Sequence, residues 1–183
     1  MNHCGTKTIE TKRLVLRQLR ADDADAMYAN WASDPDVTEF LTWQPHESVE
    51  ATCELLESWV ARYADGSFYQ WGIELKSLGE VIGTISVVSM DERIDMLHIG
   101  YCIGKPWWRQ GIMTEAFSAV IDYLFDEVGC NRIESVYDVE NPHSGDVMRK
   151  CGLSFEGVQR SADRNNRGIC DIGRYAILRS DPR

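Results

Sequence analysis

The sequence predicts a fold that mixes α-helices and β-strands. Helical and strand-like patterns alternate along the chain, and this alternation is typical of layered α and β architectures. The length of 183 residues corresponds to one domain of ordinary size. An apolar fraction of 44% and a charged fraction of 26% are those of a globular protein. No repeat, linker or low-complexity segment divides the chain, so we expect a single domain over residues 1–183.

The first half of the chain begins with a strand and two helices. Alternating apolar and polar residues predict a strand at residues 13–19. Acidic residues open a helix over residues 22–32, which ends at Asp34-Pro35-Asp36. Ser48 is the expected N-cap of a longer helix that ends at Asp65-Gly66, because apolar residues recur there at steps of three and four.

Three strand-like runs follow, and a strong helix begins the second half. The strands are predicted at residues 69–75, 81–89 and 96–103, with polar turns between them. The helix covers residues 117–128 and stops at Gly129, a residue suited to a helix C-terminus.

The last elements are a strand, a short helix and two more strands. The strand is predicted at residues 132–137, and the helix at residues 142–150 has Asn141 as its N-cap and a proline in its first turn. The final strands, at residues 153–158 and 171–178, are expected on either side of a polar loop over residues 162–168.

Charge and cysteine usage exclude several functional classes. The formal net charge of −10 argues against a general nucleic-acid partner, whose footprint is basic. No apolar run approaches the ~20 residues of a membrane span, and the N-terminus does not resemble a signal peptide, so no membrane partner is expected. The six cysteines contain no C-x-x-C pair, which favours reduced thiols in the cytoplasm and no metal site.

The most informative segment is residues 105–116, which joins a predicted strand to the strong helix. A turn at that place directs main-chain N–H groups and the positive end of the helix dipole toward one point, as in an anion site. Gly111 would let the main chain approach a phosphate closely. An ordinary tight turn also explains one glycine, while the nucleotide motifs G-x-x-x-x-G-K-[ST] and G-x-G-x-x-G are absent.

This segment resembles the pyrophosphate loop of the GNAT N-acetyltransferase superfamily, in its RimJ/RimL-like branch. The family pattern Q/R-x-x-G-x-G/A falls on Trp108-Arg109-Gln110-Gly111-Ile112-Met113, where the central glycine matches and Trp108 and Met113 depart. Three further segments resemble the branch in order: Thr11 to Arg17, the I-G-Y-x-I strand from Ile99 to Ile103, and N-x-x-S followed by K-x-G at residues 141–152.

The resemblance covers residues 10–179 and implies a fold. That fold is a central twisted, mostly antiparallel sheet of about seven strands, flanked by about four helices and splayed at the fourth and fifth strands. It also implies that acetyl-CoA is the co-substrate, with no metal, and that the acetyl group passes to a primary amine by direct attack in a ternary complex. The residues expected to bind the cofactor are Ile99, Tyr101, Ile103, Arg109, Gln110, Gly111, Ile112, Met113, Thr114, Asn141 and Ser144.

The resemblance implies two catalytic residues. Ser144 falls where the branch places a serine near the sulfur, and Met148 occupies the position at which many members carry a proton-donating tyrosine. His98 occupies the position of a glutamate that serves as general base in many members, and its ordinary pKa near 6.5 suits that role. Glu39 and His46 are weaker candidates for the base.

Several interpretations stay open at this point. The missing tyrosine and glutamate leave a non-catalytic acyl-CoA-binding sensor or interaction domain as the alternative. Trp43 and Trp71 are candidate walls of an acceptor pocket, although packing in the core also explains Trp71. Arg149 and Lys150 are candidates for the 3′-phosphate, or simply a solvated helix face.

The identity of the acceptor is also open. A protein N-terminus and a small cationic amine both fit the resemblance, and a homodimer is common among similar proteins. Residues 22–65 contain eleven acidic residues and one basic residue, Arg62, so that this segment holds the whole net charge. Solvated helix faces explain such a segment, and so does the attraction of a cationic amine.

Overall fold

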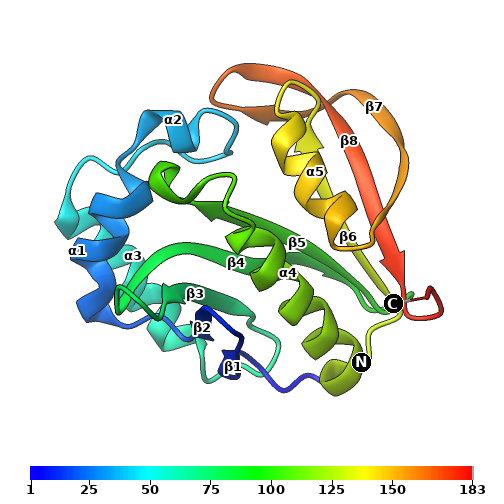
Figure 1. The fold of residues 1–183 in the computed structure, drawn as a ribbon, viewed down its shortest axis with the longest axis horizontal. Helices are drawn as coiled ribbons and strands as arrows, with labels where there is room; N and C mark the ends of the chain where they lie inside the picture. The colour runs from blue at the N-terminus through cyan, green and yellow to red at the C-terminus, as the bar shows by residue number, and fades with distance from the viewer. Residues whose placement is uncertain (183) are drawn as a thin grey trace.

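The computed structural model describes residues 1–182 as one eight-stranded sheet with five α-helices around it (Figure 1). The strand order is β1-β2-β3-β4-β5-β6-β8-β7, and all neighbours are antiparallel except β5 and β6. The predicted mixed fold with a mostly antiparallel sheet is confirmed. The strands are β1 (Ile9–Glu10), β2 (Leu14–Arg17), β3 (Gln70–Leu75), β4 (Glu80–Asp91), β5 (Met96–Ile103), β6 (Arg132–Asp138), β7 (Ser154–Asn165) and β8 (Gly168–Leu178).

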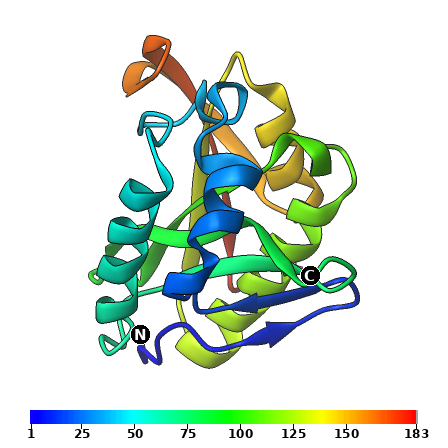
Figure 2. The same cartoon turned by 90° about the vertical axis from the view of Figure 1, so that its left-hand side faces the viewer.

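The helices form two groups on opposite sides of the sheet (Figure 2). One group packs a small core around Trp31 and Leu56, and the other packs the main core around Phe117 and Val120. The first group is α1 (Ala24–Met27), α2 (Pro35–Thr38) and α3 (Val49–Arg62); the second is α4 (Ile112–Tyr123) and α5 (Pro142–Lys150).

The first predicted helix is not one regular helix. A 3-10 turn precedes α1, and a π-helical turn over Tyr28–Ala32 follows it. The helical segment ends before Asp34-Pro35-Asp36, as predicted, and the same residues also begin α2, which was not predicted. Asp34 Oδ1 accepts the N–H of Asp36 at 2.8 Å, and Pro35 occupies the first helical position, where a missing N–H costs nothing.

Other helix ends follow the sequence closely. Ser48 Oγ accepts the N–H of Ala51 at 3.2 Å, as expected for the N-cap of α3. Gly129 adopts φ of 75°, a left-handed conformation that ends the helical segment. The helix predicted at 117–128 starts earlier than expected, because α4 begins directly after Gly111 and continues through a π-helical turn to Val128.

The polar loop expected at residues 162–168 is absent. Instead, β7 and β8 form one long hairpin with a turn at Asn166 and Arg167, and Gly168 adopts φ of 116°. This prediction was wrong because the residues of β7 are almost all exposed, so no apolar alternation marks the strand. The tip is bound to the end of α2 and to the segment after it: Asn166 Nδ2 donates to the carbonyl oxygens of Thr38 and Trp43, both at 2.8 Å.

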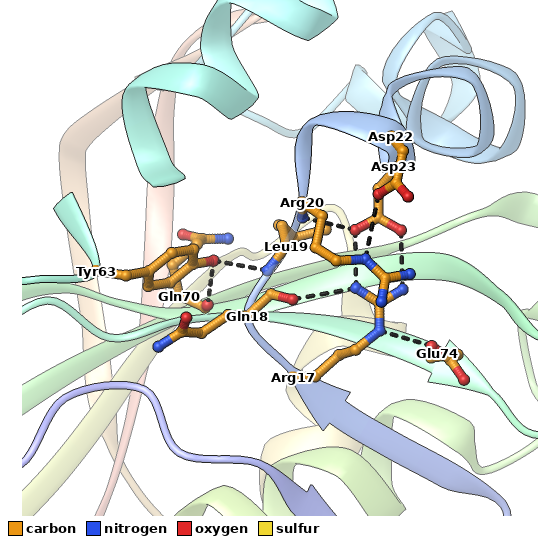
Figure 3. A network of polar contacts seen from close by, with 9 residues as sticks. All are labelled: Arg17, Gln18, Leu19, Arg20, Asp22, Asp23, Tyr63, Gln70 and Glu74. Carbon is orange, nitrogen blue, oxygen red and sulfur yellow. Dashed lines mark hydrogen bonds and ion pairs between the residues drawn. The ribbon is translucent and has the colours of Figure 1, made fainter. Parts of the chain in front are cut away.

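A buried polar network joins β2 to the first group of helices (Figure 3). Arg17 donates to both carboxylate oxygens of Asp23, each at 2.8 Å, and through Nε to Glu74 at 2.6 Å. The hydroxyl of Tyr63 accepts the N–H of Leu19 at 2.9 Å and donates to the carbonyl of Gln70 at 2.8 Å. These contacts anchor α1 and α3 to strands β2 and β3.

Candidate active site

The sheet splays where its two parallel strands meet. Strands β5 and β6 pair only from Met96↔Arg132 to His98↔Glu134 and then separate. The register of β4 against β5 shifts between Val87 and Ser89, opposite this point, and such a bulge increases the local twist. Residues 99–103 of β5 therefore have no strand partner on the side of β6. The splay is confirmed; it falls at the fifth and sixth strands because the short β1 precedes those expected.

A loop rich in unpartnered N–H groups lies between β5 and α4. Arg109 and Gly111 adopt φ of 60° and 71°, so the chain turns back on itself before the helix begins. None of the six main-chain N–H groups from Arg109 to Thr114 has an acceptor within residues 1–182. Successive free N–H groups at a helix N-terminus form an anion-binding concavity. Within this loop lie the predicted residues Arg109, Gln110, Gly111, Ile112, Met113 and Thr114.

Two side chains hold this loop in shape. Trp108 Nε1 donates to the carbonyl of Ile103 at 2.8 Å, and Gln110 Nε2 donates to the carbonyl of Pro106 at 2.8 Å. Both bonds are made by side chains and leave the N–H groups free. The departure of Trp108 from the family pattern thus has a structural role in this chain.

Arg13, directly before β2, supports the loop; the sequence places it in the opening motif from Thr11 to Arg17 but predicts no role for it at the site. Its Nη1 donates to the carbonyl of Gln110 at 2.9 Å, while its Nε contacts Glu115 at 2.6 Å. Burial by itself raises the pKa of Glu115. Hydrogen bonds from Thr11 and Arg13 lower the pKa by more than burial raises it, so the pKa of Glu115 lies below its usual value. Glu115 lies in the first turn of α4, where its carboxylate would repel an anion bound at the helix N-terminus. The ion pair with Arg13 offsets this negative charge.

Asn141 begins α5 without capping it. Its side chain makes no hydrogen bond within residues 1–182, so the amide expected as a cap is free for a ligand. Gly145 lies one turn into α5, where an added Cβ would approach the ring of Tyr137 to 2.9 Å. The glycine therefore allows α5 to pack closely against β6.

Ser144 lies in the first turn of α5 and is bound to Tyr101 of β5. The hydroxyl of Tyr101 is 2.8 Å from the Ser144 carbonyl oxygen and 3.1 Å from Ser144 Oγ. The Tyr101 ring packs on Phe117 of α4, with ring centroids 5.4 Å apart. Burial raises the pKa of the Tyr101 hydroxyl. This contact links the two sides of the splay. The sequence predicts Tyr101 as a cofactor-binding residue, but it does not predict the contact of the Tyr101 side chain with Ser144.

His98 projects from the opposite face of β5, since side chains alternate along a strand. Its Nδ1 lies 3.6 Å from Glu134 Oε1, and Glu134 is also paired with Arg132 and Arg174. Burial lowers the pKa of His98, and the nearby Glu134 only partly opposes this effect. The two predicted catalytic groups thus approach the splayed strand from different faces.

The weaker candidates are already engaged. Glu39 is paired with Arg167 of the hairpin at 3.5 Å, and His46 Nδ1 is 2.7 Å from Thr52 Oγ1. Trp71 is fully buried in the main core, so it is not a pocket wall, whereas Trp43 is partly buried beside His46.

The candidates for the 3′-phosphate lie on an exposed face of α5. Arg149 pairs with Asp146 of its own helix at 3.0 Å, and Lys150 is exposed beside it. The methionine that stands where many members have a tyrosine, Met148, is fully buried in the main core. Its side chain therefore packs and does not face the splay.

The described part of the chain contains neither a metal-binding cluster nor a membrane-spanning helix. Within residues 1–182, no group of three or more His, Cys, Asp or Glu side chains is arranged to hold a metal ion. Over the same residues, no helix is both long enough and apolar enough to cross a membrane.

A splayed α/β sheet with unpartnered N–H groups at a helix N-terminus beside the open strand is typical of acyl-CoA-dependent transferases. A family model described as "Acetyltransferase (GNAT) domain" matches residues 13–154. The chain belongs to the GNAT acetyltransferase family, in its RimJ/RimL-like branch, and is an N-acetyltransferase.

Three comparisons illustrate this relationship. The uncharacterized N-acetyltransferase YoaA of Bacillus subtilis (strain 168) is 33% identical over 171 residues, covering 93% of this chain and 96% of that protein. The ribosomal protein uS5-alanine N-acetyltransferase of Escherichia coli (strain K12) is 28% identical over 161 residues, covering 83% and 80%. A solved structure of RimL, a ribosomal L7/L12 alpha-N-protein acetyltransferase, in complex with coenzyme A has the same fold, with a TM-score of 0.84, 21% identity and coverage of 94% and 98%.

Proposed function

We propose that this enzyme transfers the acetyl group of acetyl-CoA to the primary amine of a protein N-terminus or of a small cationic amine. The observation that carries the proposal is the run of six unpartnered N–H groups from Arg109 to Thr114, beside a strand edge that the splay leaves open. Such a run suits the pyrophosphate of CoA, and an open strand edge suits the amides of pantetheine, which can pair like an added strand.

The remaining predicted residues then bind the pantetheine arm or take part in the transfer of the acetyl group. The free amide of Asn141 and the main chain of Ile99, Tyr101 and Ile103 hold the pantetheine arm. The amine attacks the thioester carbonyl directly, a C–N bond forms, the C–S bond breaks and the electron pair goes to sulfur. His98 accepts, directly or through water, the proton that the acceptor ammonium loses before its nitrogen attacks. The second nitrogen proton passes to water as the amide forms, and Ser144 donates a hydrogen bond to the departing thiolate.

The acceptor is proposed from charge and from relatives. The Escherichia coli relative is named for the alanine of ribosomal protein uS5, which favours a protein N-terminus. Within the acidic segment, Asp23, Asp36 and Glu39 are paired with Arg17, Lys105 and Arg167, whereas Glu50, Glu54 and Glu57 lie on the exposed face of α3. Attraction of a cationic acceptor would therefore come from the exposed carboxylates of this segment that are not in ion pairs, among them those of α3.

The proposal also covers the compartment, the domain organisation and the oligomeric state of the enzyme. None of the six cysteines forms a disulfide within residues 1–182, which supports a reducing compartment, so we propose a cytoplasmic enzyme. We also propose one domain over the whole chain, and a homodimer by analogy with similar proteins.

The proposal is tested by mixing the purified protein and acetyl-CoA with a panel of N-terminal peptides and small amines. We expect CoA release and a mass gain of one acetyl group on at least one acceptor. Tight CoA binding without turnover on the whole panel would instead indicate the non-catalytic acyl-CoA sensor.

Replacing Ser144 by alanine tests its role at the sulfur. We expect the single-turnover rate of acetyl transfer to fall about 10- to 100-fold, because one preorganised hydrogen bond to developing charge is lost. The dissociation constant of acetyl-CoA, measured by calorimetry, should stay within about twofold. Ser58→Ala, on the exposed side of α3, is the control and should leave both quantities unchanged. An unchanged transfer rate in Ser144→Ala would remove Ser144 from the mechanism.

The pH dependence of the rate tests His98. Because burial lowers the pKa of His98 below its ordinary 6.5, the ring is neutral and able to accept a proton at pH 7. We expect kcat/KM to be flat near pH 7 and to fall only below about pH 6.5. His98→Gln should lower kcat/KM at pH 7 about 100-fold and abolish this acid limb, whereas His3→Gln, near the N-terminus, should keep it. An acid limb that persists in His98→Gln would assign the base to another group.

A further inference from the structure

The hydroxyl of Tyr101 contacts two oxygen atoms of Ser144, and the protons available fix how they bond. A carbonyl oxygen carries no proton, so the contact of 2.8 Å requires Tyr101 to donate to the Ser144 carbonyl. Tyr101 then has no proton left for Ser144 Oγ at 3.1 Å, so this second bond is donated by Ser144. In the structure, the proton of the Ser144 hydroxyl is therefore directed at Tyr101.

This arrangement is not the one that a leaving thiolate needs. With its proton on Tyr101, Ser144 Oγ presents only lone pairs to a group bound beside it. Rotation of the Tyr101 hydroxyl from the carbonyl to Oγ reverses the pair, so that Tyr101 donates to Ser144 and Ser144 donates outward. The cost is small, because a helical carbonyl in the first turn also accepts the N–H four residues further on.

We propose that Tyr101 is a positioning residue whose hydroxyl sets the direction of the Ser144 proton and so allows Ser144 to donate to the CoA thiolate. This inference rests on the proposed function. Tyr101 keeps its own proton throughout, because burial raises its pKa, and the packing of its ring on Phe117 fixes the place of the hydroxyl. A donor that itself accepts a hydrogen bond is strengthened by it, so two hydroxyls in series stabilise the thiolate more than one.

The test measures the pKa of the CoA thiol in the complex of the protein with CoA, from the ultraviolet absorbance of the thiolate as pH is raised. It needs no acceptor. We expect the bound thiol to titrate about one pH unit below free CoA, a tenfold stabilisation of the thiolate. Tyr101→Phe and Ser144→Ala should each return the value toward that of free CoA, and the double variant should match Ser144→Ala alone, because Tyr101 acts only through Ser144.

Tyr137→Phe is the matched control. Tyr137 packs against Gly145 of the same helix, but its hydroxyl makes no hydrogen bond within residues 1–182, so its removal should leave the thiol pKa unchanged. With an acceptor present, Tyr101→Phe should also slow single-turnover transfer about tenfold at unchanged affinity for acetyl-CoA.

The outcomes separate the two proposals. If CoA binds but Tyr101→Phe leaves the thiol pKa as in the wild type, this inference is overturned and the proposed function stands. The same holds if the double variant shows the sum of the two single effects, since a merely structural tyrosine would act independently. Failure of the wild-type protein to bind CoA would overturn both.

Discussion

Replacing Gly111 by aspartate should weaken acetyl-CoA binding about 100-fold, or ~2.7 kcal/mol. Gly111 lies in the middle of the six free N–H groups, and an added Cβ there meets only Arg13 Nη2, at 3.8 Å. A carboxylate would therefore fit in space but would occupy the concavity and repel the pyrophosphate. Two unit charges 4 Å apart repel by about 4 kcal/mol at an effective dielectric constant of 20, so an effect of this size is expected. Isothermal titration with CoA measures it.

Gly79→Asp is the matched control for this substitution. Gly79 lies in the turn between β3 and β4 and adopts φ of 73° against 71° for Gly111, and a Cβ added to it would meet no atom within 4 Å. The Gly79→Asp substitution introduces the same backbone strain and the same added charge as Gly111→Asp, but at a position away from the loop between β5 and α4. Equal affinity of Gly111→Asp and Gly79→Asp for CoA would show that the loop is not the pyrophosphate site.

Replacing Asp23 by alanine should lower the free energy of unfolding by about 3–5 kcal/mol, because it leaves the buried Arg17 without its main partner. The exposed fractions of the two side chains are 7% for Asp23 and 12% for Arg17 (Figure 3). Asp23 also accepts the N–H of Arg20 at 2.7 Å. For a chain of this length, we expect the melting temperature to fall by about 10 °C. Asp22→Ala, one residue earlier and 77% exposed, should change it by less than about 2 °C.

This effect should also depend on pH. Burial by itself raises the pKa of Asp23. Hydrogen bonds from Arg17 and from the main chain of Arg20 lower the pKa by more than burial raises it, so the folded-state pKa lies below the usual value. Stability from a lowered carboxyl pKa is present above the unfolded-state value of ~3.9 and is lost as pH falls through the folded-state value. The difference in melting temperature between wild type and Asp23→Ala should therefore be constant from pH 7 to 5 and shrink below pH 4. A difference in melting temperature as large at pH 2 as at pH 7 would attribute the effect of Asp23→Ala to packing.

Much of the framework was predictable because local signals mark it. The bounds of β5 and α5 agree with the prediction to the residue, since turns flank the strand and Asn141-Pro142 and Gly152 flank the helix. The loop at Gly111 was predictable from the resemblance, and the left-handed conformation of that glycine agrees with a tight turn.

The rest depends on contacts that no local pattern encodes. Strand β7 is exposed along almost its whole length, so it shows no alternation of buried and exposed residues from which a strand could be predicted. Tyr101 and Ser144 are 43 residues apart, and only the splay of β5 from β6 brings them together. Arg13 carries a visible signal, its place in the opening strand motif, but its bond to the loop depends on how β2 and α4 pack.

The fastening of the hairpin tip has a consequence for how the molecule folds. Asn166 and Thr38 are 128 residues apart in the chain, and their bond can form only after both the hairpin and the first helices are in place. Contacts of such long separation form late, because the loss of chain entropy must first be offset by other contacts. We therefore expect the tip to close late during folding. We also expect it to open at a free energy well below that of global unfolding, since its release breaks a few hydrogen bonds and leaves every strand pair intact.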